Sequence, residues 1–442
     1  MTRPLAVICL AAGMGKRTKV SMPKVLLPLC GRTLASSALL AAADLKPART
    51  VVVLHNQMER VQASLEKELA GDFDHDSRSI VYVDQGAPNG TGHAVRVGME
   101  QLKDFVGDVI VIYGDCPLMT AETLQDLVDL RGDAACSALT AFTDDATGLG
   151  RILRNEVGNF VGIREHKDCS DEELLIDETN CGFYCFDSEK LRPALANLQP
   201  NNAQGEYYLT DVIADFVSQG EVLPTAEAAD IAEVMGVNSL ADLSLVQSVM
   251  QERILFQHMS NGVLITDPAA TWIDHDVEIG SDTKILPCTV IGSGCKIGNG
   301  CEVGPFTHLR GGTVLEDGAA LGNFVEAKNA HMGQGAKAKH LTYLGDAVVG
   351  AKANIGCGTI TANYDGVNKH QTKIGARAFI GSGTVLCAPV EVGDDAMTAA
   401  GAVVKPGTTI KTHELWLGVP ARYLRQRELP AAAAASSGVK KS

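Results

Sequence analysis

The stretch that decides the fold runs from residue 279 to residue 321 and reads IGSDTKILPCTVIGSGCKIGNGCEVGPFTHLRGGTVLEDGAAL. An aliphatic residue recurs in it every six positions, eight times in succession: Ile279, Ile285, Ile291, Ile297, Val303, Leu309, Leu315 and Leu321. A helix requires apolar residues every three or four positions, and a half-buried strand requires them every two. A period of six instead indicates a solenoid in which each hexapeptide forms one flat face of a triangular coil.

The same phase returns further along the chain, at Val349, Ile355, Ile374, Ile380, Leu386 and Val392. We therefore predict a left-handed parallel β-helix of hexapeptide repeats over roughly residues 263–410, within a domain of residues 263–428. The rhythm breaks over residues 323–344 and again over residues 356–373. Breaks in a solenoid map to loops and edges, where functional residues gather.

Composition sets limits on the function. The 442 residues allow two or three domains, and the 45% hydrophobic content supplies ample core. The low aromatic content of 5% and the 45 glycines suit a solenoid built from small and β-branched residues. A net charge of −15 disfavours a nucleic-acid partner or a membrane surface. Anionic small-molecule substrates would need a local cluster of Lys and Arg.

The twelve cysteines are scattered and form no CxxC pair. The chain starts Met-Thr-Arg-Pro, runs directly into a strand-like segment and shows no signal peptide or long apolar span. We interpret the cysteines as reduced thiols of a cytoplasmic protein, and the sequence disfavours a structural zinc site.

The first part of the chain alternates strand and helix patterns. Residues 5–10 form a continuous apolar run typical of a strand buried on both faces. Further strands are predicted at residues 50–55, 80–84, 108–113 and 134–142, with a helical pattern over residues 121–131. This alternation predicts an α/β doubly wound, Rossmann-like, mostly parallel sheet over residues 1–235. A helical linker follows over residues 236–262, and the alanine-rich tail, residues 429–442, is typical of disorder.

Glycine-rich loops follow two of these strands, AAGMGKR after the first and QGAPNGTGH after a later one. Ligands bind beyond the carboxyl ends of parallel strands, and successive backbone N–H groups can hold phosphates. Each loop alone also fits a tight strand–helix turn, and Asp115 in YGD alone also fits a turn cap. Together they favour a phosphate-binding site with Mg²⁺.

Nearly the whole chain, about residues 5–425, resembles one family. LAAGMGKR, PKVL, QGAPNGTGHA, YGDCPL, GLGRI, REHKD, ETNCG, NNAQGEYYLTD and GVN occur in the order seen in bacterial N-acetylglucosamine-1-phosphate uridylyltransferases. HLRGG, NFVEAK, KHLTYLGD, NIGCGTITANYDG and IGSGT resemble the glucosamine-1-phosphate acetyltransferase half of the same bifunctional enzyme. The motifs of the second half are the more specific, because the first domain type activates many sugars.

The resemblance implies that the first domain transfers UMP from UTP to N-acetylglucosamine-1-phosphate. The residues implied for the base and sugar nucleotide are Leu10, Ala11, Ala12, Gly13, Gln85, Gly90, Thr91, Tyr113 and Gly114, those for the triphosphate Arg17 and Lys24, those for the amino-sugar Gly148, Glu165 and Asn180, and those for Mg²⁺ Asp115 and Asn238. A sugar-phosphate oxygen attacks the α-phosphorus in line and pyrophosphate leaves. Catalysis of this kind is mainly positioning and charge neutralisation.

For the second domain the resemblance implies acetyl transfer from acetyl-CoA to glucosamine-1-phosphate. His340 is implied as the general base for the amine, a task that suits an imidazole near neutral pH. The residues implied for the sugar phosphate are Arg310, Lys328, Tyr343, Asn354 and Lys369, and those for acetyl-CoA Cys357, Asn363, Tyr364, Ser382, Ala400 and Arg422. From its residue type alone, His340 is more often structural than catalytic, and the motif reverses that balance.

The chain departs from the family pattern at several points. Lys16 stands where the family usually has Thr, and Cys357 where it usually has Ala. The segment between Asp267 and Phe306 is shorter than usual, which predicts one or two fewer coils. Gly418 replaces the usual late Arg before Val-Pro, and Arg422 is the candidate to substitute for it in binding acetyl-CoA.

Three functions are compatible with these observations. The leading one is the bifunctional enzyme that makes UDP-N-acetylglucosamine, as a homotrimer by analogy with other β-helices of this type. The second is a nucleotidyltransferase for another sugar-1-phosphate, with a β-helix that serves only regulation or assembly. The third is a non-enzymatic scaffold with both folds. The residues around His340 argue against the second, and the full set of Lys24, Asp115, Asn238 and His340 argues against the third.

Overall fold

The computed structural model describes residues 3–13, 15–70, 80–200 and 205–426. The tail at residues 429–442 and the Lys16 side chain, both subjects of prediction, lie outside this described part. The chain forms two compact units that divide between Met250 and Gln251. The division falls inside helix α7 (Leu240–Ser260), which occupies most of the predicted linker at residues 236–262.

The first unit is built on a sheet with the strand order β11-β7-β10-β6-β1-β4-β5. Its strands are β1 (Leu5–Leu10), β4 (Arg49–Leu54), β5 (Ile80–Asp84), β6 (Asp108–Tyr113), β7 (Cys136–Phe142), β10 (Glu178–Asp187) and β11 (Thr225–Glu227). All neighbours pair in parallel except β10, which runs antiparallel between β6 and β7. The predicted mostly parallel sheet is confirmed.

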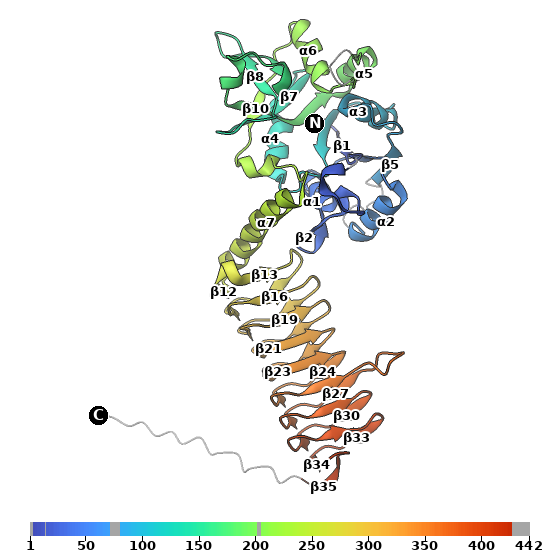
Figure 1. Cartoon of the computed structure of the whole chain (residues 1–442), viewed down its shortest axis with the longest axis vertical. Helices are drawn as coiled ribbons and strands as arrows, with labels where there is room; N and C mark the ends of the chain where they lie inside the picture. The colour runs from blue at the N-terminus through green and yellow to red at the C-terminus, as the bar shows by residue number, and fades with distance from the viewer. Residues whose placement is uncertain (1–2, 14, 71–79, 201–204, 427–442) are drawn as a thin grey trace, which may run out of the picture. The chain divides into compact units, whose positions relative to one another are not determined.

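Helices cover both faces of this sheet (Figure 1). The helices are α1 (Leu34–Ala43), α2 (Met58–Glu68), α3 (Thr91–Glu100), α4 (Ala121–Arg131), α5 (Ser188–Asn197) and α6 (Thr210–Ser218). One cluster of buried side chains joins α1, α2 and α4 to the sheet, and a second cluster joins α3, α5 and α6 to it. A hairpin of β8 (Arg151–Arg154) and β9 (Phe160–Arg164) extends the sheet beside β10. The unit is therefore doubly wound.

The second unit is a coil of parallel strands with three faces (Figure 1). The first face holds β12 (Leu264–Ile265), β15 (Lys284–Ile285), β18 (Glu302–Val303), the start of β21 (Ala320–Lys328), the start of β23 (Lys337–Gly345), β25 (Asn354–Ile355), β28 (Phe379–Ile380), β31 (Met397–Thr398) and β34 (Glu414–Leu417). The second holds β13 (Thr271–Ile273), β16 (Thr289–Ile291), β19 (His308–Arg310), the ends of β21 and β23, β26 (Ile360–Ala362), β29 (Val385–Cys387) and β32 (Val403–Val404). The third holds β14 (Glu278–Ile279), β17 (Lys296–Ile297), β20 (Val314–Leu315), β22 (His331–Met332), β24 (Ala347–Val349), β27 (Thr372–Ile374), β30 (Val390–Val392) and β33 (Thr408–Ile410).

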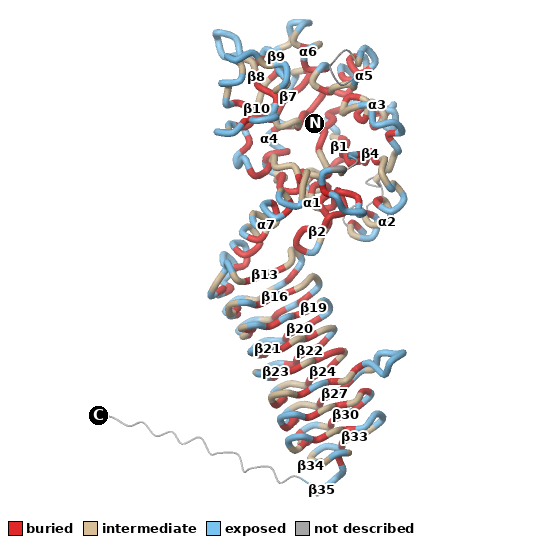
Figure 2. Tube along the Cα trace, viewed as in Figure 1, coloured by how far each residue is buried: buried red, intermediate tan, exposed pale blue. Residues whose placement is uncertain are grey.

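The six-residue period has the predicted structural cause. Eight aliphatic residues form the six-residue series from Ile279 to Leu321. Seven of them are at most 4% exposed, and the eighth, Ile279, is half-buried. Figure 2 shows buried and exposed positions alternating along the successive coils. This is the arrangement expected of a left-handed β-helix of hexapeptide repeats, and the prediction is confirmed.

Coil length explains where the rhythm breaks. Most coils repeat after 18 residues, as in Lys284 paired with Glu302. Lys328 pairs with Gly345 after only 17 residues, and Val349 pairs with Ile374 after 25. The first coil takes 20 residues, from Leu264 to its partner Lys284, because two extra residues stand between the first and second faces. From Lys284 onward, the changes in length all fall at one corner, between the second and third faces, where two turns are each one residue shorter and the next coil is seven residues longer. We call this the second corner, defined by Arg310, Lys328, Gly345 and Ala362, and the corner between the first and second faces the first corner.

None of the twelve cysteines forms a disulfide. Among the described helices, none combines the length and the apolar character that crossing a membrane requires.

Candidate functional site

A cavity of about 290 Å³ lies at the carboxyl ends of β1 and β6. Eight of its lining residues are predicted site residues, namely Leu10, Ala12, Gly13, Gln85, Gly90, Thr91, Tyr113 and Asp115. Four others were not predicted, namely Pro88, Ala94, Glu206 and Tyr208. All four stand inside the quoted motifs QGAPNGTGHA and NNAQGEYYLTD, so the motif signal was available for them. The sheet thus gathers both glycine-rich loops at one edge, as the topology rule requires.

The loop after β5 depends on Gly90. Gly90 has a φ of +101°, and a Cβ there would lie 2.5 Å from the Tyr207 carbonyl oxygen. Gly92 donates a backbone hydrogen bond to the same oxygen, so the segment around Tyr207 is held against the loop. The Gln85 Nε2 group donates to the Gly90 carbonyl oxygen at 3.1 Å. Glycine is required here because the two backbones approach too closely for any side chain.

A cluster of cations and oxygen acceptors lies beside this cavity. The Lys24 ammonium contacts Asp115 Oδ2 and also donates to Asn238 Oδ1 at 3.2 Å. Arg17 donates to the same Asn238 oxygen at 2.8 Å. Burial and the charge of Asp115 hold the pKa of the adjacent Cys116 well above its ordinary value, so this thiol stays protonated. The four predicted phosphate and metal residues are therefore brought together.

Backbone contacts bring Asn238 to this place from a distant part of the chain. Val237 donates its N–H to the Asp115 carbonyl oxygen at 2.9 Å, which ties the segment before α7 to the end of β6. The Asp242 carboxylate accepts from the N–H groups of Asn238 and Ser239, each at 2.8 Å. Asp242 thereby satisfies free donors at the start of α7 and fixes the Asn238 backbone.

The residues predicted for the amino-sugar lie beside β8 and β10, and they do not line the 290 Å³ cavity. Asn180 donates its N–H to the Gly150 carbonyl oxygen, and its Oδ1 accepts from the Tyr184 hydroxyl at 2.8 Å. Burial raises the pKa of Glu165, whose carboxylate accepts from the Thr210 hydroxyl at 3.5 Å. Gly148 has a φ of +79° with open space around its Cα. Their assignment to a sugar remains a prediction.

Two predicted residues face the protein interior. A Cβ on Gly114 would lie 3.1 Å from the Ala11 Cβ, so these two residues pack against each other. Ala11 also donates its N–H to the Val53 carbonyl oxygen, which anchors the loop after β1 to β4. Both residues shape the backbone around the cavity.

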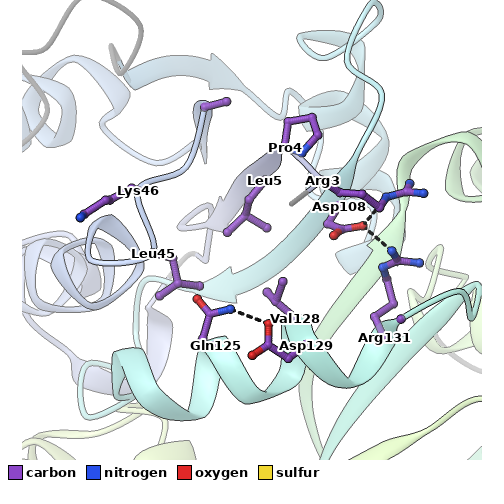
Figure 3. Close-up of a pocket in the computed structure, with 12 residues that line it drawn as sticks. Arg3, Pro4, Leu5, Leu45, Lys46, Asp108, Gln125, Val128, Asp129 and Arg131 are labelled. Carbon is purple, nitrogen blue, oxygen red and sulfur yellow. Dashed lines mark hydrogen bonds and ion pairs between the residues drawn. The ribbon is translucent and has the colours of Figure 1, made fainter. Parts of the chain in front are cut away.

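A second cavity, of about 620 Å³, lies at the opposite ends of the strands, among Arg3, Leu5, Asp108 and Arg131 (Figure 3). It is larger than the one beside Lys24, but three of its charged lining residues, Arg3, Asp108 and Arg131, are already paired with one another. Arg3 and Arg131 both contact Asp108, at 3.2 and 2.7 Å. Parallel sheets bind ligands at the other end, so we assign this ion-pair network to the structure of the sheet.

In the second unit, three of the six residues predicted for acetyl-CoA, Cys357, Ser382 and Ala400, form a column along the first corner, whereas Asn363 and Tyr364 follow β26 at the second corner. His340 is in register with Asn323 of the preceding coil. Counting on from the paired residues of β23, β25, β28, β31 and β34 places Cys357, Ser382, Ala400 and Gly418 at the same position of the following coils. Adjacent parallel strands lie about 4.8 Å apart. His340 therefore lies one coil from Cys357.

An arginine lies close to Gly418, the position where the family usually has Arg. Arg422 lies on β35 (Arg422–Gln426), which folds back antiparallel on β34. It pairs with Leu417, the residue before Gly418, and its side chain is exposed. The hairpin therefore brings a cation to the end of the His340 column without using position 418.

Three cations gather at the second corner. Arg310 and Lys328 are in register on successive coils. The inserted loop of residues 363–371 returns Lys369 to the same place, and the close approach of Lys369, with the charge of Arg310, lowers the pKa of Lys328. Arg310 also contacts the Glu326 carboxylate at 2.9 Å. Cations crowded enough to disfavour each other's charge are typical of a site for a multiply charged anion.

The inserted loop is fixed by its own polar contacts. Asp365 accepts from the N–H groups of Val367 and Asn368 and contacts the His370 ring at 2.7 Å, which lowers the pKa of Asp365 to about 2. Asn363 is buried and donates to Asp346 at 2.5 Å, while Tyr364 is exposed. These contacts hold the loop so that Lys369 stays beside Lys328.

The five residues predicted for the sugar phosphate do not all meet in one chain. Arg310, Lys328 and Lys369 share the second corner, and Tyr343 lies on the second face in register with Glu326. Asn354 lies on β25 of the first face, in register with Lys337 and Phe379.

Comparison with known proteins matches each of the two units to a different family model. Residues 7–215 match the family model of the MobA-like NTP transferase domain. Residues 270–305 and 371–406 match the model of the bacterial transferase hexapeptide. The chain is thus a transferase that joins a nucleotidyltransferase unit to a hexapeptide-repeat unit.

The chain belongs to the family of bifunctional GlmU proteins, enzymes that combine a uridylyltransferase with an acetyltransferase. It is 41% identical to the bifunctional protein GlmU of Corynebacterium diphtheriae, over 90% of this chain and 89% of the relative. It is 42% identical to that of Geobacillus sp. strain WCH70, over 91% and 93%, and 40% identical to that of Desulfitobacterium hafniense strain DCB-2, over 92% and 95%.

Proposed function

We propose that this protein acetylates glucosamine-1-phosphate from acetyl-CoA and then transfers UMP from UTP to the N-acetylglucosamine-1-phosphate formed, releasing pyrophosphate. The observation that carries the proposal is the presence, in units of different folds, of two separate cation-rich sites. One is Lys24 and Arg17 beside Asp115, and the other is Arg310, Lys328 and Lys369. Both stand against a net charge of −15, which makes local cation clusters necessary for phosphate ligands.

The first site has the groups that uridylyl transfer requires. Asp115 and Asn238 supply a carboxylate and an amide oxygen, the ligand types that Mg²⁺ prefers. A cation, the Lys24 ammonium, already contacts both, so the donor set fits a positive ion. Bound Mg²⁺ would neutralise charge on the phosphates. Lys24 and Arg17 would orient the triphosphate, and the loop at Gly90 would hold the base.

The second site has a base and a place for a sugar phosphate. His340 is exposed at the first corner, one coil from Cys357. It would accept the proton of the substrate amine as that amine attacks the thioester carbonyl carbon, and CoA would leave as the thiol. Lys328, Lys369 and Arg310 would hold the phosphate.

We further propose that the protein acts as a homotrimer in the cytoplasm, where the unpaired cysteines would stay reduced. Phe306 and Phe324 are about half exposed and stack at 5.1 Å, with exposed Leu341 on the next coil. Exposed apolar ridges of this kind favour association. Asn354 on the first face would complete the sugar-phosphate site of a neighbouring copy.

Two variants measured in both half-reactions test the assignment. Asp115→Ala should lose most uridylyl transfer and keep acetyl transfer. His340→Ala should lower acetyl transfer by the ~10²–10⁴-fold that a general base contributes, and leave uridylyl transfer nearly unchanged. Unaltered acetyl transfer in His340→Ala would remove this residue from the mechanism and favour a β-helix that serves only assembly.

A further inference from the structure

The Lys24 ammonium occupies the place between the two proposed metal ligands. It contacts Asp115 Oδ2 and donates to Asn238 Oδ1 at 3.2 Å, while Arg17 donates to that same amide oxygen at 2.8 Å. A carbonyl oxygen has two lone pairs, so both acceptor positions of Asn238 Oδ1 are in use. Among the described residues, the contact given for the other Asp115 oxygen is the Cys116 thiol, at 3.9 Å. A metal ion must therefore displace a cation to reach this pair of ligands.

The position of the ammonium is built into the fold. The Lys24 side chain is only 9% exposed. A Cβ on Gly15 would lie 3.0 Å from the Lys24 Cβ, and one on Gly13 would lie 3.9 Å from its Cε, so the stem passes closely over the glycine loop. The short helix of residues 24–26, which follows Pro23, fixes the start of this side chain. Lys24 is thus a packed residue with a directed charge.

Charge repulsion prevents the Lys24 ammonium and a divalent ion from occupying the same oxygens together. Lys24 and Arg17 bring two positive charges to these oxygens, and Asp115 is the carboxylate that contacts the ammonium. Glu206 lines the cavity and Asp242 interacts with Arg17. A divalent ion on the same oxygens would bring two more positive charges within short range of the ammonium, and the two cations would repel each other. A triphosphate supplies the missing negative charge and a stronger partner for the lysine.

Resting on the proposed uridylyl transfer, we propose that Lys24 is a built-in competitor of the metal ion. Without nucleotide, its ammonium holds Asp115 and Asn238 and keeps metal affinity low. When a nucleoside triphosphate binds, the phosphates take the ammonium and release both oxygens. Metal ion and nucleotide thereby bind interdependently, and Lys24 couples them as a positioning residue.

The test measures Mn²⁺ binding to the full chain without nucleotide, by the loss of the free-ion signal in electron paramagnetic resonance. Mn²⁺ shares the oxygen-ligand preference of Mg²⁺. Lys24→Met keeps the packed stem and removes the charge, and Lys24→Gln is a second neutral variant in case the first misfolds. We expect both to bind Mn²⁺ at least about tenfold more tightly than the wild type, within the usual range of coupling between sites. Lys46→Met removes one cation from the turn at the opposite end of the sheet and should change Mn²⁺ affinity less than twofold.

A further substitution, Asp115→Asn in the Lys24→Met background, distinguishes the competition by Lys24 from the proposed metal site at Asp115. Loss of the tightened Mn²⁺ binding there supports the competition at Asp115. Unchanged Mn²⁺ binding in both neutral variants overturns the competition while leaving the proposed reaction intact. Tight Mn²⁺ binding that survives Asp115→Asn overturns the metal site itself, and with it this part of the proposed function.

Discussion

Replacing Gly90 with alanine should damage the first unit much more than the same change at Gly86, four residues earlier in the same loop. Both glycines have positive φ, +101° and +69°. At Gly90 a Cβ would meet the Tyr207 carbonyl oxygen at 2.5 Å, and at Gly86 it would meet nothing within 4 Å. The neighbour at Gly90 is backbone and accepts a hydrogen bond from Gly92, so it cannot rotate away.

The magnitude follows from these contacts. The positive φ of Gly86 costs an alanine about 1–2 kcal/mol. Gly90, with φ +101° and ψ 174°, lies in a region that is essentially restricted to glycine, where an alanine costs about 1–3 kcal/mol. Gly90→Ala must in addition move the Tyr207 segment and weaken its hydrogen bond, worth about 1 kcal/mol. We expect Gly90→Ala to cost about 2–3 kcal/mol and Gly86→Ala about 1 kcal/mol, partly offset by the lower entropy of the unfolded chain. Gly90→Ala should also lower uridylyl transfer more than tenfold, because the Gln85 contact and the cavity wall move together.

The two units can be followed separately in one urea titration. Both tryptophans, Trp272 and Trp416, lie in the second unit, whereas helices α1–α6 lie in the first. Far-UV circular dichroism should therefore report the first unit, and tryptophan fluorescence the second. We expect the dichroism midpoint of Gly90→Ala to fall while the fluorescence midpoint and acetyl transfer stay unchanged. Equal losses in Gly90→Ala and Gly86→Ala would refute the close approach of Tyr207 as the constraint.

Three further outcomes follow from the structure. Leu309→Ala, at a fully buried position, should lower the free energy of unfolding of the second unit by about 2–5 kcal/mol. Val290→Ala, on the outer side of a neighbouring strand, should lower it by less than ~1 kcal/mol. Tryptophan fluorescence in urea measures both. Burial raises the folded-state pKa of Glu165, so its ionisation destabilises the fold as pH rises through the interval above 4.5, and Glu165→Gln should raise the melting temperature at pH 7. Glu173 has a lowered pKa, chiefly from the Ser170 N–H, so Glu173→Gln should have the opposite sign. Phe324→Asp should convert the proposed trimer to a smaller species in sedimentation velocity, and an unchanged sedimentation coefficient would count against the apolar ridge of Phe306, Phe324 and Leu341 as the interface.

The sequence predicted elements best where a simple period decides the structure. The boundaries of β1, β5, β6 and α4 agree with residues 5–10, 80–84, 108–113 and 121–131. Strand β10 was missed because Glu178, Asn180 and Gly182 interrupt its apolar pattern, and its register shifts between Asn180 and Tyr184. Its place between β6 and β7 depends on pairing with distant strands, which no local pattern encodes.

The candidate site was likewise predictable only in part. Loops that follow strands, such as those at Gly13 and Gly90, could be placed from the topology rule alone. The contact of Lys24 with Asn238 joins residues more than two hundred positions apart, and the motif resemblance anticipated it only as shared ligand binding. The register of His340 with Cys357 required the coil lengths, because a 17-residue coil cannot be read from a pattern that expects 18.

From Lys284 onward, the variation in coil length within the β-helix is confined to the second corner, so the three faces stay in residue-for-residue register on either side of it. The scaffold therefore tolerates rewriting at this corner without a cost elsewhere in the ladder. If the second corner holds the sugar phosphate as proposed, a loop of different length or chemistry between Ala362 and Thr372 would change which acceptor molecule is held, while the column at His340 keeps its geometry. On that proposal, acceptor choice and acyl-donor choice are separable traits, open to independent change by evolution or by protein engineering.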